Sequence, residues 1–241
     1  MSTLLLRLAA PLQSWGVSSK FDRRMSNLEP SRSGVIGLLA AALGMSRNDS
    51  LDRFKKLKFG VRIDQPGTLE KDFQMVHRGE GSKSSSWLTY RYYLEDAVFL
   101  AALEGNPEFL GKLEIAVRNP IYPLYLGRRS CPPVGQLCLG LRETGMRESL
   151  LQENWQAAPW YQKRARWKKV DFLEIVRDAE PDEEAYTVRD MPECFSQLRR
   201  QYDFRNVIRE HIPLIDIVRE GAGIADVAVA TEHDPMALLE E

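Results

Sequence analysis

The order of apolar segments in the first 141 residues constrains the fold of this chain more than any other feature. The apolar run Thr3–Ala9 predicts a buried strand. Gly34–Leu43 predicts a helix, with Ser31 or Ser33 as its cap and Gly44 as its end. The segments that follow are predicted, in order, as a short helix ending near Leu57, strands Phe59–Asp64 and Ala97–Leu103, a helix Pro107–Val117, and a last strand at Ile121–Leu126 or Gln136–Leu141. With one insertion set aside, this is the β-α-β-β-α-β order of a ferredoxin-like, RRM-like α+β fold.

The insertion, at about residues 68–94, consists of two strand-like stretches joined by small polar residues. Thr68–Val76 and Trp87–Leu94 are the stretches, and the residues between them are rich in glycine and serine. The pattern predicts a β-hairpin that projects from the body like a thumb. Its candidate contact residues are Arg78, Lys83 and Trp87.

The chain divides, on this interpretation, into residues 1–145, the ferredoxin-like domain, and residues 146–241, a small β-rich C-terminal region with an acidic tail. A short helix is predicted around Glu148–Asn154. The candidate strands of the second region are Val170–Arg177, Ala185–Arg189 and Asn206–His211.

The formal net charge of −1 averages two regions of opposite sign. Residues 1–177 carry 27 Lys and Arg against 18 Asp and Glu, whereas residues 178–241 carry 6 against 16. The overall charge therefore does not exclude a polyanionic partner for the basic region. We expect the acidic region to face solvent or a basic protein neighbour, away from any nucleic acid.

Several classes of protein find no support in the sequence. Cys131, Cys138 and Cys194 have no metal-ligand spacing, so reduced thiols are expected, with no metal site and no cofactor. Arg7 interrupts the apolar N-terminus, and the longest apolar run is far shorter than the ~20 residues that span a bilayer. A cytoplasmic protein without membrane association is expected.

The most informative local motif is Tyr125-Leu126-Gly127-Arg128-Arg129-Ser130. Two adjacent guanidinium groups on a glycine-hinged turn suit phosphate oxygens, and Tyr125 is placed to stack on a base. The alternative is a solvated basic turn with a structural tyrosine.

A second basic motif, residues 160–169, has five positive charges, three aromatic residues and no acid. Such interleaving is typical of a single-stranded nucleic-acid track, so Lys163, Arg164 and Arg166 are candidate RNA contacts. The alternative is a surface strand with solvated lysines and packed tryptophans.

A third candidate site is the start of the helix that includes Gly34. Arg32, Ser33 and Gly34 would offer a cation and first-turn amides to an anion. Gln13 and Trp15 leave the first strand where this helix enters and are expected to line the same region.

A catalytic alternative uses His77 at the base of the hairpin. Metal-independent RNA cleavage needs a general acid and base, which His77 with Tyr90 or Lys83 would supply. A lone histidine is more often structural or merely exposed.

Four segments carry a family resemblance, in family order. They are Leu12–Gly16, Pro30–Leu39, Tyr125–Pro132 and, less specifically, Arg200–Tyr202. Together they resemble the CasD-type subunits of type I-E CRISPR Cascade complexes, members of the RAMP superfamily. The stretch that includes Arg128 is the most specific.

The resemblance implies a non-catalytic subunit that caps the 5′ handle of the CRISPR RNA. It also implies contacts with a CasC-type backbone subunit and the Cascade large subunit, with target DNA in the same complex. A related subtype uses its equivalent subunit as the repeat-processing nuclease, and a generic RNA-binding module is a third possibility. The handle-contact residues carried over are Gln13, Trp15, Arg32, Ser33, Arg128, Arg129 and Ser130.

Overall fold

The body of the protein is built around one antiparallel sheet of seven strands. The computed structural model describes residues 1–16, 22–78, 85–214 and 217. The order across the sheet is β10-β11-β9-β4-β7-β1-β8. The strands are β1 (Ser2–Ala9), β4 (Lys58–Gln65), β7 (Val98–Gly105), β8 (Cys138–Arg142), β9 (Phe172–Asp178), β10 (Tyr186–Cys194) and β11 (Gln201–Pro213).

The four neighbouring strands β4, β7, β1 and β8 form the predicted ferredoxin-like core. Helix α1 (Arg32–Ala42) follows β1, and helix α3 (Pro107–Arg118) follows β7. Ser31 caps α1 by accepting from the Gly34 amide, and Asn106 caps α3. A short helix α2 (Asp52–Lys55) leads into β4. The predicted fold class is confirmed.

Both faces of the sheet are covered, which explains the nearly continuous apolar sequence of β1. Leu4, Leu6 and Leu8 point to the face covered by α1 and α3. Leu5 points to the opposite face, which is covered by helix α4 (Met146–Gln152). Alternate residues of a strand point to opposite faces, so a strand buried on both sides needs apolar residues at every position.

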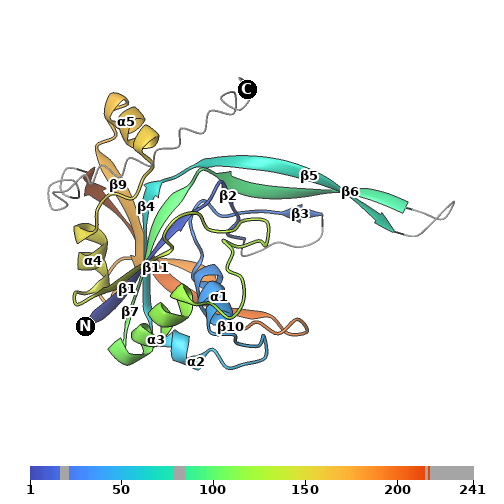
Figure 1. Ribbon diagram of the computed structural model, residues 1–241, viewed down its shortest axis with the longest axis horizontal. Coiled ribbons are helices and arrows are strands. Elements are labelled where there is room, and N and C mark those ends of the chain that lie inside the picture. Colours follow the sequence, from blue (N-terminus) through green and yellow to red (C-terminus); the bar gives the residue numbers. More distant parts are fainter. Residues whose placement is uncertain (17–21, 79–84, 215–216, 218–241) are drawn as a thin grey trace, which may run out of the picture.

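The predicted hairpin is present and projects well beyond the body of the molecule (Figure 1). It consists of β5 (Thr68–Arg78) and β6 (Ser85–Glu95), paired along their full length. Two very short strands pair with β6: β2 (Leu12–Gln13) pairs near its base, at Leu94 and Glu95, and β3 (Arg23–Arg24) pairs with its middle, at Tyr90 and Arg91.

Two expectations differ from the structure, and the structure also decides between the two predicted positions of the last core strand. The C-terminal strands extend the same sheet, because β9 pairs with β4, so the region after residue 145 has no sheet of its own. Of the two predicted positions for the last core strand, Gln136–Leu141 is confirmed as β8, whereas Ile121–Leu126 is irregular, since Pro120 and Pro123 have no amide to donate to a ladder. The basic segment from Trp160 is helix α5 (Pro159–Trp167), not a surface strand.

Candidate nucleic-acid interface

The basic loop after Leu126 is a tight turn packed against the end of β2. The Leu126 amide donates to the Cys131 carbonyl oxygen at 2.7 Å, and the Leu126 carbonyl oxygen accepts from the Ser14 amide at 3.1 Å. Gly127 has a φ of +90°, and a Cβ atom there would lie 1.7 Å from the Ser14 carbonyl oxygen. Two segments far apart in the sequence, both part of the family motif, therefore meet at this loop.

The two arginines of the loop have different environments. The Arg128 guanidinium carbon lies 4.5 Å from the centroid of the Tyr93 ring on β6, and Nη2 donates to the Arg24 carbonyl oxygen at 3.0 Å. Arg128 Nη1 is buried and makes no hydrogen bond within the described residues. Arg129 and Ser130 are exposed. Arg128 is thus held by the protein, whereas Arg129 extends into solvent.

The environment of this loop shifts the pKa of the Tyr93 phenol. Burial raises the pKa of the Tyr93 phenol, but hydrogen bonding to Arg128 and Ser130, the charge of Arg128 and hydrogen bonding to Arg91 lower it. The net effect is a pKa below the ordinary value of a tyrosine.

Five arginines lie on β3, on β6 and in the loop that packs against β6, and we call them the hairpin-base cluster: Arg23, Arg24, Arg91, Arg128 and Arg129. Strand β3 pairs with β6 so that Arg23 is opposite Tyr90 and Arg24 is opposite Arg91. Within the described residues, none of the five forms an ion pair with a carboxylate. Unpaired guanidinium groups beside tyrosines suit the phosphates and bases of a single strand.

Arg91 and Tyr93 were not among the predicted site residues. A signal for them was present, because the two-residue period of β6 puts both side chains on one face of the strand. No pattern in the sequence indicates that this face meets the loop that contains Arg128.

Gln13 and Trp15, both predicted RNA contacts, are fully buried. Gln13 Nε2 donates to the Ala97 carbonyl oxygen at 2.7 Å, and its Oε1 accepts from Trp15 Nε1 at 3.0 Å. The Trp15 ring lies against Gly34, where an added Cβ would be 2.8 Å from the ring. Because both side chains are buried, the structure favours a supporting role for them inside the protein over direct contact with RNA. Tyr125 is half-buried beside them in the loop.

The start of α1 is occupied by carboxylates of the protein itself. The Arg32 amide donates to Asp190 Oδ2 at 2.7 Å, and Arg32 Nη1 lies 2.6 Å from Asp178 Oδ2. Burial lowers the pKa of Arg32, and the charge of Asp178 offsets part of this effect. Arg205 binds both carboxylates from β11. The predicted anion site at Arg32, Ser33 and Gly34 is wrong for this structure, because an internal carboxylate fills it.

The same contacts are an exception to the expectation for the acidic C-terminal region, of which Glu180, Asp182 and Glu184 do face solvent. Asp178 and Asp190 face the interior, where they neutralise Arg32 and Arg205, and do not face solvent or a protein neighbour. A carboxylate buried beside arginines is stable only when it is paired, and here each is paired.

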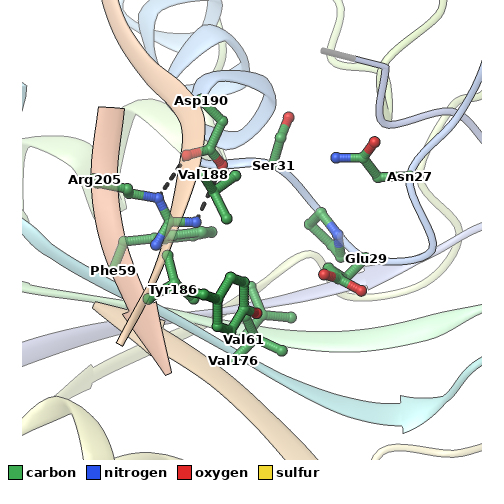
Figure 2. Close-up of a pocket in the computed structure, with 12 residues that line it drawn as sticks. Asn27, Glu29, Ser31, Phe59, Val61, Val176, Tyr186, Val188, Asp190 and Arg205 are labelled. Carbon is green, nitrogen blue, oxygen red and sulfur yellow. Dashed lines mark hydrogen bonds and ion pairs between the residues drawn. The ribbon is translucent and has the colours of Figure 1, made fainter. Parts of the chain in front are cut away.

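A small pocket lies between the start of α1 and strands β10 and β11. Figure 2 shows Asn27 and Glu29 on one side, the Asp190–Arg205 pair on the other, Ser31 above and Tyr186 below. Its volume of about 20 Å³ is room for one water molecule, not for a nucleotide.

The remaining predicted contacts that the structure describes belong to α5 and to the hairpin strands. Lys163 and Arg164 are exposed on α5, across the sheet from α1 and α3 (Figure 1), and Arg166 belongs to the same helix. Trp87 is exposed on β6, and Arg78 is the last residue of β5. Lys83 lies outside the described residues.

His77 is exposed on β5, where its Nδ1 lies 2.7 Å from Ser86 Oγ. Tyr90 is opposite Phe73, four residues along the strand from His77, which is about 13 Å at ~3.3 Å per residue. The hairpin therefore does not bring His77 and Tyr90 together as an acid–base pair.

In the part of the chain that the structure describes, no helix has the length and apolar character needed to cross a membrane.

The sequence of this chain is similar to those of known proteins. The family model described as CRISPR-associated protein (Cas_Cas5) matches residues 3–208. The CRISPR system Cascade subunit CasD of Escherichia coli (strain K12) is 39% identical over 158 residues, which cover 58% of this chain and 70% of that protein.

Two solved structures are also similar. A chain of a CRISPR RNA-guided surveillance complex is 31% identical, with a TM-score of 0.72 and coverage of 88% of this chain and 90% of that one. A crystal structure of a Cas protein is 36% identical, with a TM-score of 0.70 and coverage of 89% and 97%.

Proposed function

Because this chain belongs to the Cas5 family of CRISPR-associated proteins, we propose that it is a non-catalytic, RNA-binding subunit of a Cascade-type surveillance complex. In this role it caps the 5′ handle of the CRISPR RNA and joins a CasC-type backbone subunit to the large subunit, so that the complex can engage target DNA. The complex acts in the cytoplasm.

The hairpin-base cluster is the observation that carries this proposal. None of the five arginines has a carboxylate partner among the described residues, and Arg24, Arg91 and Arg128 lie on the same face of β6 as Tyr93. Short single-stranded RNA offers phosphates to such arginines and base faces to such tyrosines. Arg129 and Ser130 are the exposed residues of the loop, so they are the proposed direct contacts.

The hairpin supports the assembly role. Phe73 is opposite Tyr90 and Met75 is opposite Leu88, so these four side chains share one face of β5 and β6. Phe73 is 68% exposed and Met75 is 62% exposed. Such apolar surface on a projecting element favours burial against another subunit. We assign this face to the protein contacts of the complex.

An assembled complex tests the proposed RNA contact. Arg129→Ala should weaken retention of the guide RNA and reduce the salt slope of its binding by about 0.7, the effect of one lost phosphate contact on a single strand. Arg47→Ala, an exposed arginine after α1, is the matched control. Unchanged RNA retention in the Arg129 variant, with the loop intact, would remove this loop from the interface.

A further inference from the structure

Helix α5 presents an outward face of tryptophans and cations, which we call the α5 face: Trp160, Lys163, Arg164, Trp167 and Lys168. The first four have the spacing i, i+3, i+4 and i+7, which puts them on one side of a helix. Trp160 is 50% exposed and Trp167 is 85% exposed. Tryptophan side chains are seldom exposed to this extent, because burial of the indole is favourable. Two of them on one helix face therefore indicate a candidate binding surface.

The opposite side of the helix is firmly attached to the body. Ala165 is buried, and the Ala158 amide donates to Gln65 Oε1 at 3.1 Å. Just before the helix, the Gln156 amide donates to Asp64 Oδ2 at 2.6 Å. Asp64 is fixed in turn by a fully buried pair with Arg62. The α5 face is therefore displayed on a rigid element.

The charge of this region is entirely positive. Residues 155–170 contain no Asp or Glu. Lys163, Arg164, Lys168 and Lys169 make no ion pair with any described residue. Some exposed cations elsewhere do have a carboxylate, as Lys55 has Glu193 at 2.7 Å. The α5 face thus lacks a counter-ion that the described protein could provide.

We propose that the α5 face binds a single-stranded nucleic-acid segment other than the guide handle. The indoles would stack on unpaired bases, and the cations between them would bind the connecting phosphates. Trp160 and Trp167 are separated by about 10.5 Å along the helix axis, so the sugar-phosphate backbone of the nucleic acid can pass between the two indoles. A duplex offers no free base faces, and an acidic protein surface would match the cations but not the indoles.

This site is separate from the hairpin-base cluster. Helix α5 lies on the side of the sheet covered by α4, across from α1 (Figure 1). The two surfaces can therefore hold different strands, and the inference stands without the proposed handle contact.

The test uses the full chain with a short fluorescent oligothymidylate, a matched duplex and a salt titration followed by fluorescence anisotropy. Arg129→Ala is present throughout, so that the hairpin-base cluster does not mask the second site. The double variant Lys163→Gln, Arg164→Gln should lower the salt slope by about 1.4, because each lost phosphate contact removes about 0.7. Trp167→Ala should weaken binding roughly five- to 150-fold.

The controls separate a specific site from general attraction to a basic protein. Arg47→Gln with Lys56→Gln removes two exposed charges elsewhere and should leave affinity and slope unchanged. The substituted side chains of α5 are exposed, so the unfolding midpoint should not move. The proposal fails if the α5 double variant keeps the parental slope, or if Trp167→Ala binds normally while the duplex binds as tightly as the single strand.

Discussion

The carbonyl oxygen of Ser14 lies 1.7 Å from the position that a Cβ atom on Gly127 would occupy. This contact, together with the Ser14–Leu126 hydrogen bond, attaches the basic loop to the end of β2. It also explains why a glycine stands immediately before the two arginines of this loop. Any other residue would push the loop off its support and move Arg128 away from Tyr93.

Gly127→Ala is predicted to destabilise the protein and to weaken RNA binding. The added methyl group meets backbone atoms, and the positive φ adds strain of about 1–3 kcal/mol. Gly111→Ala is the control: it lies within α3 with no atom near its Cβ position, so it should gain about 0.5–1 kcal/mol. Denaturant unfolding measures both. A Gly127 variant as stable as the parent would show that the loop adapts to the extra atom.

Arg32→Ala is predicted to reduce stability, because it leaves Asp178 with one of its two buried partners. Removing one partner of a buried ion pair costs roughly 3–5 kcal/mol. Equilibrium unfolding measures the loss, and RNA binding is measured at temperatures where the variant is folded. A variant with parental stability and lost RNA binding would restore the helix start as an RNA contact.

Acid should weaken the turn between β9 and β10 through Glu183. Arg177 donates to both oxygens of Glu183, and this pair and the Glu180 amide lower the pKa of the carboxyl from 4.5 to about 2. A lowered pKa means that the stabilisation is complete above about 4.5 and is lost as the pH falls through about 2. Melting temperatures between these pH values should fall less steeply for Glu183→Gln than for the parent. Parallel curves would contradict this role.

His77 is predicted to have no catalytic role. Repeat RNA incubated with the purified protein in EDTA should remain intact, because Tyr90 lies too far from His77 to complete an acid–base pair. Gel analysis of the RNA measures this. Specific cleavage that disappears in His77→Ala would overturn the non-catalytic assignment.

Much of the fold could be predicted because its signals are local. The apolar run of β1, the Ser31 cap of α1 and the proline at the start of α3 each act within a few residues. Their order then specified the ferredoxin-like arrangement. Helix α5 was the exception. Its basic and aromatic residues suit the exposed face of a helix or of a strand, and the burial of Ala165 against the body is seen only in the folded structure.

The candidate site was predictable in composition but not in arrangement. The motif that contains Arg128 and Arg129 was identified, yet Arg24 and Arg91 join it only through the pairing of β3 with β6. Arg32 was predicted to meet RNA, but its partners Asp178 and Asp190 come from strands far along the chain. No pattern in the sequence near Arg32 indicates that these two carboxylates are its partners.

The sequence by itself determined the elements, their order and the presence of a basic, aromatic surface, because periodicity, caps and turns depend on neighbours in the chain. The tertiary structure decided which charges remain free. Arg32 is neutralised by a carboxylate brought from β9, whereas Arg129 and the α5 face meet none among the described residues. The physical reason is that ion pairing acts over a few ångströms in space, and only the folded chain fixes which charges come that close.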